Sequence, residues 1–188
     1  MKIIETRFQD LYVLEFEPIH DERGYFVRKF CINEMSSILK SRQILQVNES
    51  GNLYGGTTRG LHFQVAPHAE TKIVSCTKGA VFDVVVDMRS DSDTFLEYFS
   101  IELRESGFKA LYIPEGFAHG YQVLKAASRI LYFTTALYSK EHEHTLRFDD
   151  PKVNINWPRP ISHISVKDAS APYLVEGFTG ISQFTNEK

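Results

Sequence analysis

Short runs of alternating or continuous apolar residues, separated by turn residues, cover most of the chain. Alternate side chains of a β-strand share one face, so these runs predict strands. We predict strands at Leu11–Phe16, Tyr25–Cys31, Gln43–Ser50, Thr57–Gln64, Thr71–Thr77, Ala80–Asp87, Tyr98–Leu103, Phe108–Ile113, Gly120–Leu124 and Arg129–Tyr138. Turn residues recur about every eight to twelve residues, a spacing typical of a sandwich or barrel.

Other segments have different patterns. Glu34–Lys40 has helical spacing, with Asn33 as its expected N-cap. Lys78-Gly79 predicts a tight hairpin between two strands. Val84-Val85-Val86 is apolar at consecutive positions, which predicts a strand buried between two layers. The irregular, proline-bearing segment 149–168 contains the only tryptophan, and we expect this C-terminal tail to pack across the barrel mouth.

Two histidine-containing runs, Thr58–Gln64 and Pro114–Gly120, each place an imidazole near a glycine in an apolar context. In the first run, His62 and Gln64 share one strand face, and Leu61 and Phe63 lie on the other. With Arg59 nearby, the polar face is typical of a pocket wall. The alternative for one such run is a half-exposed surface strand.

Composition narrows the class of protein. The 188 residues suffice for one well-packed domain, and we expect a single domain over residues 1–188. A net charge of −3 argues against general DNA or RNA binding. The N-terminus lacks a signal-peptide pattern, and no apolar run reaches membrane-span length. The two cysteines, Cys31 and Cys76, are expected to be reduced thiols of a cytoplasmic protein.

The two histidine runs also bear on metal binding. Metal sites of double-stranded β-helix (cupin) proteins usually use His-x-His with a later Glu, then Pro-x-Gly-x-x-His. Pro114–His119 fits the second pattern, but Gln64 stands where the first pattern has its second histidine. Zinc and iron favour three or four His, Cys or carboxylate ligands, so we expect no metal here.

The chain contains, in this order, the motifs Asp21–Gly24, Gln46-x-Asn48, Arg59–Gln64, Asp83–Arg89, Ile113–Gly120 and Trp157-Pro158. Together these motifs resemble the dTDP-4-dehydrorhamnose 3,5-epimerase family. The resemblance runs from about Leu11 to Asp168, nearly the whole chain. It implies an all-β jelly-roll, or double-stranded β-helix (cupin) barrel, with one or two short helices.

The family's reaction inverts carbons next to the ketone of a nucleotide-linked 4-keto-6-deoxy sugar, without a metal or redox cofactor. The resemblance implies that His62 is the base and that Asp168 orients its imidazole. Lys72 resembles the cation beside the enolate oxygen, and Tyr132 resembles the acid on the opposite sugar face. His119 resembles a further donor to that oxygen. Each residue also has a purely structural alternative. These are a strand histidine for His62, a histidine that remains from a cupin metal site for His119, a surface aspartate for Asp168, a solvated lysine for Lys72 and a core tyrosine for Tyr132.

The resemblance also implies how the nucleotide is held. Arg59 and Arg23 are the expected phosphate contacts, because guanidinium groups match phosphate oxygens. In the family, the Arg23 region reaches in from a neighbouring subunit, so we expect a homodimer with the N-terminal strands at its interface. Phe26 and Tyr138 are expected to stack on base or sugar. Further substrate-contact positions are Gln46, Asn48, Glu143 and Lys167.

Three positions depart from the family pattern. Arg28 replaces a common Glu that can accept a hydrogen bond from thymine, whereas Arg only donates. If Arg28 faces the base, guanine or cytosine becomes an alternative to thymine. Glu70 replaces a common Gln, and Tyr121 replaces a common Phe.

We therefore expect a cofactor-independent isomerase that acts on a nucleotide-sugar substrate as a 3,5-epimerase in deoxysugar biosynthesis. The alternatives within enzymes are a single-site 3-epimerase and a ketoisomerase on the same scaffold. A metal-dependent cupin oxygenase and a non-catalytic sugar-nucleotide binding cupin are alternatives from other classes.

Overall fold

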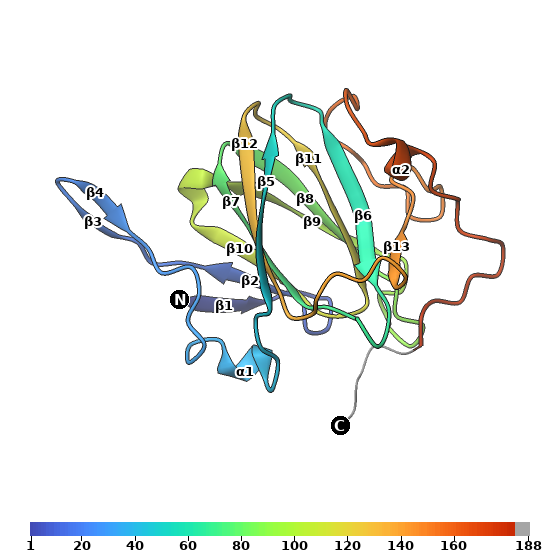
Figure 1. The fold of residues 1–188 in the computed structure, drawn as a ribbon, viewed down its shortest axis with the longest axis horizontal. Helices are drawn as coiled ribbons and strands as arrows, with labels where there is room; N and C mark the ends of the chain where they lie inside the picture. Colours follow the sequence, from blue (N-terminus) through green and yellow to red (C-terminus); the bar gives the residue numbers. More distant parts are fainter. Residues whose placement is uncertain (183–188) are drawn as a thin grey trace.

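Two antiparallel sheets face one another and form an open barrel in the computed structural model, which describes residues 1–182 (Figure 1). The last six residues of the predicted domain, 183–188, lie outside the described residues. The first sheet has the order β1 (Lys2–Glu5), β2 (Tyr12–Glu15), β10 (Lys109–Ile113), β7 (Lys72–Lys78), β12 (Ser128–Thr134) and β5 (Gln46–Asn52). The second has the order β13 (Glu143–Thr145), β6 (Thr58–Gln64), β11 (Phe117–Val123), β8 (Ala80–Asp87) and β9 (Tyr98–Arg104).

The remaining elements are short. A hairpin of β3 (Ile19–Asp21) and β4 (Gly24–Phe26) projects away from the barrel (Figure 1). The helices are α1 (Ser36–Leu39), the 3₁₀ turn η1 (Glu105–Gly107) and α2 (Val166–Ala169). In the described part of the chain, neither four-residue α-helix approaches the length that a bilayer requires. The predicted all-β jelly roll with two short helices is confirmed.

The core between the two sheets is a cluster of buried apolar side chains. Val74, Val85, Leu111 and Ile130 are fully buried there. Residues 84–86 of β8 are all 0% exposed, which confirms the prediction of a strand buried on both faces. Burial of this kind is the main source of stability in a domain of this size.

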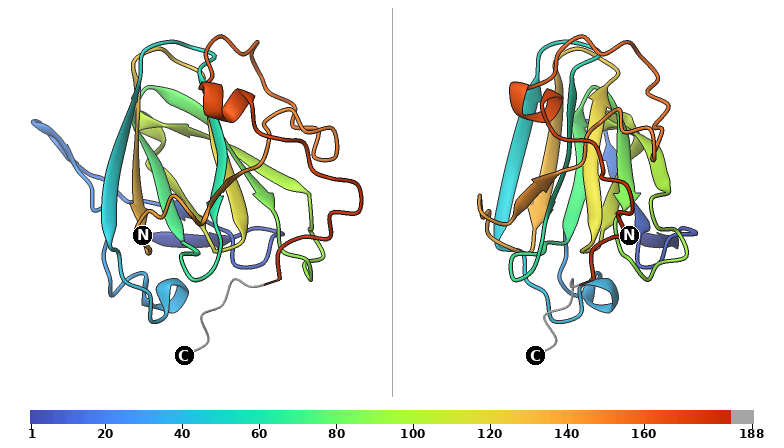
Figure 2. Two further views of the ribbon diagram at one scale, coloured as in Figure 1. Left: turned by 45° about the vertical axis from the view of Figure 1, so that its right-hand side comes forward. Right: turned by 90° about the vertical axis from the view of Figure 1, so that its right-hand side faces the viewer.

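Both sheets are also covered on their outer faces. Helix α1 and the segment before it pack Met35 and Leu39 against the first sheet. The chain after β13 runs along the outside of the second sheet, where Leu146, Val153 and Trp157 pack on Leu61 and its neighbours (Figure 2). The outward-facing apolar side of β6 is thereby buried, which leaves the opposite side of β6 facing the barrel interior.

Several predicted boundaries are wrong for identifiable reasons. Strand β4 ends at Phe26 because the following residues leave the hairpin to cover the first sheet. Lys78-Gly79 makes no hairpin, since β7 and β8 belong to different sheets and the chain crosses between them at Gly79, where φ is 78°. Asn33 is not the N-cap of α1, which begins after Met35 without a side-chain cap.

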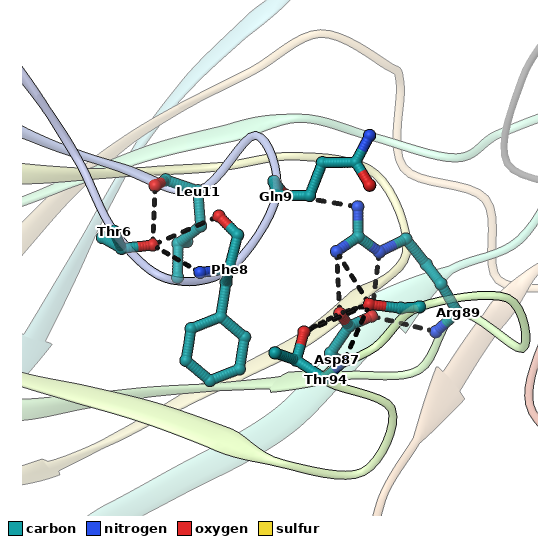
Figure 3. Close-up of polar contacts among 8 residues, drawn as sticks. Thr6, Phe8, Gln9, Leu11, Asp87, Arg89 and Thr94 are labelled. Carbon is teal, nitrogen blue, oxygen red and sulfur yellow. Dashed lines mark hydrogen bonds and ion pairs between the residues drawn. The ribbon is translucent and has the colours of Figure 1, made fainter.

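A buried carboxylate holds the turn after β8 (Figure 3). Asp87 accepts hydrogen bonds from Arg89 Nε at 2.8 Å, Arg89 Nη2 at 2.7 Å and Thr94 Oγ1 at 2.7 Å. Arg89 also donates to the carbonyl of Gln9 at 3.3 Å, which links this turn to the loop before β2. Asp87 therefore holds the turn after β8 directly and, through Arg89, the loop before β2.

Candidate active site

Two adjoining cavities of about 440 and 290 Å³ open from the barrel interior. His62, Lys72 and Tyr132 line both of them. The first cavity is also lined by Ser50, Arg59, His119, Tyr121, Lys167 and Asp168. The second is also lined by Gln46, Asn48, Glu70, Tyr138 and Glu143.

His62 and Asp168 form a hydrogen-bonded pair between β6 and α2. The imidazole Nε2 lies 2.7 Å from Asp168 Oδ1, and the amide of Gly60 donates to Asp168 Oδ2 at 3.2 Å. Ser165 caps α2 by accepting a hydrogen bond from the Asp168 amide, which fixes the start of this short helix. One ring nitrogen of His62 is thus engaged, and among residues 1–182 the other has no hydrogen-bond partner.

The environment of Asp168 favours its ionised form. Burial alone raises the pKa of this carboxyl, but the hydrogen bonds from His62 and Gly60 and the imidazole's charge outweigh burial, and the pKa lies below its usual value. An ionised Asp168 stabilises a protonated His62. The hydrogen bond also fixes the orientation of the imidazole ring.

Lys72 begins β7 and brings an ammonium group to the same place. Its Nζ lies 3.0 Å from Glu70 Oε1 and 3.4 Å from the backbone carbonyl oxygen of His62. Both side chains of the ion pair are largely buried, with exposed fractions of 13% and 12%. The cation is therefore held against the backbone of His62 and lines the same two cavities.

Tyr132 reaches the cavities from the first sheet, where it pairs with Asn48 on β5 and Val74 on β7. Burial raises the pKa of the Tyr132 phenol above its ordinary value, and the nearby Arg59 guanidinium offsets this only in part. The phenol keeps its proton at neutral pH and is able to donate it. His62 and Tyr132 come from different sheets and line the same two cavities.

His119 lies on β11 directly opposite His62 in the strand pairing. Its Nε2 is 3.0 and 3.2 Å from the two carboxylate oxygens of Asp83, which is fully buried on β8. Asp83 was missed in the sequence, although a carboxylate inside a strand buried on both faces needs a partner. This need for a partner was the feature of the sequence that could have identified Asp83.

Glycine allows the two histidine strands to approach closely. A Cβ on Gly60, where φ is 106°, would lie 2.7 Å from the Cα of Gly120 and 2.7 Å from the carbonyl oxygen of His119. The glycines beside each histidine are therefore required by the packing of β6 on β11. This contact sets the relative position of the two imidazoles.

The second cavity contains a set of linked polar groups. The Tyr138 amide donates to Gln46 Oε1 at 2.8 Å, and the Tyr138 hydroxyl donates to Glu143 Oε2 at 3.0 Å. Lys167 makes an ion pair with the same carboxylate. Burial raises the pKa of Glu143, but hydrogen bonds from Lys167 and Tyr138 outweigh burial and lower it overall.

Three predicted contact residues do not join this site within one chain. Arg23 and Phe26 lie on the projecting β3–β4 hairpin, where Arg23 pairs with Asp21 at 2.6 Å and Phe26 is 66% exposed. Arg28 follows the hairpin and pairs with Glu34 at 3.1 Å. None of the three lines either cavity. The other predicted residues all do.

Gln64 does not act as a free ligand. Its amide nitrogen donates to the carbonyls of His68 and Leu137, at 2.9 and 3.3 Å, and its oxygen accepts from the Ser139 amide at 2.6 Å. Gln64 therefore ties two loops together beneath the second cavity. Within residues 1–182, no three His, Cys, Asp or Glu side chains are grouped to hold a metal ion.

The chain is similar to one family of known proteins over most of its length. The family model for dTDP-4-dehydrorhamnose 3,5-epimerase matches residues 5–176. A dTDP-4-dehydrorhamnose 3,5-epimerase of Sinorhizobium fredii is 43% identical over 178 residues, which cover 92% of this chain and 91% of the relative.

Solved structures are similar over most of the chain. The Legionella pneumophila dTDP-6-deoxy-D-glucose-3,5-epimerase in complex with dTDP-4-keto-L-rhamnose has a TM-score of 0.87 at 35% identity and covers 92% of each chain. A 3'-monoepimerase from Streptomyces bikiniensis, in complex with dTDP-quinovose, has a TM-score of 0.84 at 25% identity, covering 90% of this chain and 86% of that one. The chain belongs to the dTDP-4-dehydrorhamnose 3,5-epimerase family.

Proposed function

We propose that this protein epimerises a dTDP-linked 4-keto-6-deoxy hexose at C3 and C5. The observation that carries the proposal is the His62–Asp168 pair, at 2.7 Å, in a cavity wall shared with Lys72 and Tyr132. A base, a cation and a phenol around one space are the groups needed to invert an acidic carbon beside a ketone. The epimerase relatives support the substrate class.

The reaction starts with transfer of the proton from the carbon beside the ketone to the free nitrogen of His62. The C–H electron pair forms the enolate, whose oxygen charge is stabilised by the Lys72 ammonium, and the imidazolium is stabilised by Asp168. Tyr132 then donates its proton to the opposite face of that carbon, and the carbonyl re-forms. A placed acid–base group contributes roughly 10²–10⁴ in rate.

The diphosphate and nucleoside occupy the remaining polar positions in this proposal. Arg59 contacts phosphate, because its guanidinium lines the first cavity and carries charge of the right sign. Gln46, Asn48 and Tyr138 contact the nucleoside from the second cavity. The relatives with dTDP-sugars support thymine as the base. The Arg28–Glu34 ion pair supports a structural role for Arg28 at the root of the hairpin.

We infer that the active form is a homodimer. The β3–β4 hairpin exposes Ile19, Tyr25 and Phe26 at 70%, 57% and 66%, so it presents apolar surface away from its own barrel. Contiguous exposed apolar surface of this kind marks association sites. In this proposal Arg23 and Phe26 complete the site of the neighbouring subunit. The two unpaired cysteines support a reducing cytoplasmic location.

The product formed from dTDP-4-keto-6-deoxyglucose tests the proposal. NMR is expected to show a 4-keto sugar inverted at both C3 and C5. Inversion at C3 alone would make the protein a 3-epimerase, an alternative supported by the Streptomyces bikiniensis 3'-monoepimerase of the same fold. A displaced carbonyl would show a ketoisomerase. Binding without conversion would show a non-catalytic module.

A further inference from the structure

A chain of side-chain hydrogen bonds connects Arg59 to Ser50 across the first cavity wall. Arg59 Nε donates to Asn52 Oδ1 at 2.8 Å, and Asn52 Nδ2 donates to the Tyr121 hydroxyl at 3.3 Å. The Tyr121 hydroxyl lies 2.8 Å from Ser50 Oγ. Asn52 and Tyr121 are buried, with exposed fractions of 3% and 4%, so these bonds form away from bulk water.

The direction of each bond in the chain follows from its first donor. A guanidinium group only donates, so the oxygen of the Asn52 amide faces Arg59 and the nitrogen faces Tyr121. The phenol proton then has two acceptors within reach, Ser50 Oγ at 2.8 Å and Asn52 Oδ1 at 3.4 Å. The shorter distance lies in the normal O–H···O range and the longer one lies outside it, so Ser50 Oγ is the better acceptor. Tyr121 therefore donates to Ser50.

Ser50 is left with a hydroxyl proton of its own. Among residues 1–182, the hydrogen bond with Tyr121 is the one that its hydroxyl makes. Ser50 lines the first cavity, as do His62, Lys72 and Tyr132. It is two residues from Asn48, which pairs with Tyr132, and alternate residues of a strand share a face. The hydroxyl proton of Ser50 is thus available for a hydrogen bond to a ligand in the cavity that His62, Lys72 and Tyr132 line.

We propose that Ser50 donates a hydrogen bond to an oxygen of the bound hexose, and that Tyr121 and Asn52 fix it as a donor. This rests on the proposed function, since it assigns the hexose to this cavity. A site built to donate to a substrate oxygen discriminates against sugars that lack the acceptor, because a polar group is then left unpaired. Ser50 is thereby a specificity-determining residue, and Tyr121 is its positioning residue.

Calorimetric binding of dTDP-glucose and of dTDP alone tests this without requiring turnover. Ser50→Ala is expected to raise the Kd for dTDP-glucose about 3- to 10-fold, the effect of one neutral hydrogen bond. The same variant is expected to bind dTDP, which has no hexose, within about twofold of wild type. Ser50→Thr keeps the hydroxyl and is expected to restore dTDP-glucose binding to within about threefold.

The positioning role of Tyr121 predicts coupling between the two residues. Tyr121→Phe is expected to weaken dTDP-glucose binding, and Ser50→Ala combined with Tyr121→Phe to weaken it less than the product of the two single effects. Ser100→Ala, on the edge strand β9, is the control for removal of a serine hydroxyl outside the cavities.

Three results would overturn the proposal. The first is an unchanged Kd of Ser50→Ala for dTDP-glucose. The second is an equal loss of affinity for dTDP, which would mean that Ser50 contacts the diphosphate. The third is that Ser50→Ala and Tyr121→Phe weaken dTDP-glucose binding independently. A wild-type protein that binds dTDP-glucose but fails to epimerise the keto-sugar would refute the proposed function alone. Failure of the wild type to bind dTDP-glucose would refute both.

Discussion

The His62 imidazole and the Asp168 carboxylate lie 2.7 Å apart, although 106 positions separate them along the chain. Strand β6 supplies one and the last short helix supplies the other. The tail of the chain therefore completes the proposed catalytic base rather than only covering the barrel.

Asp168→Asn preserves the shape of this side chain but removes its charge. Because a neutral amide stabilises the imidazolium much less than a carboxylate, kcat is expected to fall about 10²- to 10⁴-fold. Steady-state kinetics measures the loss, and thermal unfolding checks that the variant is folded. A variant that keeps more than a tenth of wild-type kcat would show that Asp168 does not support the base.

Tyr132→Phe removes the proposed acid and leaves the base in place. Proton abstraction by His62 is expected to continue, so the substrate exchanges hydrogen with solvent while product formation falls by about 10²-fold or more. NMR in D₂O follows both processes in one sample. Equal loss of exchange and of product would assign Tyr132 to the first proton transfer instead.

The proposed exchange of hairpins predicts complementation between two inactive variants. His62→Ala lacks the base, and Arg23→Ala lacks a phosphate contact that its neighbour needs. A heterodimer purified through two different tags contains one site with both residues intact, so about half of the wild-type activity is expected. Homodimers of each variant are the controls. An inactive heterodimer would mean that Arg23 serves its own subunit, and a fully active Arg23→Ala homodimer would mean that Arg23 serves no site.

Thymine recognition predicts an order of ligand stabilisation. At about 100 times its Kd, dTDP is expected to stabilise the fold by about 2.7 kcal/mol, which corresponds to roughly 5–10 °C in Tm. GDP, CDP and UDP at the same concentration are expected to raise Tm less. Preference for GDP or CDP would instead assign base recognition to Arg28, whose guanidinium donates hydrogen bonds.

The ionisation of Asp87 is expected to account for part of the loss of folding stability at low pH. Burial raises the pKa of this carboxyl, but hydrogen bonds from Arg89, Ser92 and Thr94 outweigh burial and place it below the usual value. The folded-state pKa is therefore below the value of about 3.9 in an unfolded chain. Ionised Asp87 stabilises the fold above about pH 4, and this contribution is lost as the pH falls through the folded-state pKa.

Urea unfolding at two pH values tests this contribution. Asp87→Asn is expected to lower the free energy of unfolding at pH 7 by about 3 kcal/mol, because it leaves Arg89 without its carboxylate. The difference from wild type is expected to shrink below pH 4. Asp91→Asn, at an exposed neighbouring position, is the control. A difference that stays constant with pH would mean that packing, not charge, accounts for the loss.

The fold was predictable because its strands have regular patterns. Ala80–Asp87 was predicted with the bounds that β8 has, since consecutive apolar residues leave little alternative to a buried strand. Strand β13 and helix α2 were not predicted, because three or four residues carry too little periodicity. The prediction of a hairpin at Lys78-Gly79 was wrong because the residues of a turn do not show to which sheet the next strand belongs.

The site was predictable mainly where motifs resemble a family. Asn48 belongs to such a motif and Tyr132 was assigned by the family resemblance, and the structure places them as paired neighbours. The partners Asp83 and Asn52 were not predicted, because their roles depend on long-range contacts between strands. Arg23 shows a second limit of sequence-based prediction, because within a single chain its side chain does not line either cavity.

Hydrogen exchange at the sugar carbons tests the central proposal most directly. In D₂O, the wild-type protein is expected to incorporate solvent deuterium at C3 and C5 of dTDP-4-keto-6-deoxyglucose, and His62→Ala is expected to incorporate none above the uncatalysed rate. Deuterium incorporation by His62→Ala at the wild-type rate would contradict the assignment of this imidazole as the base.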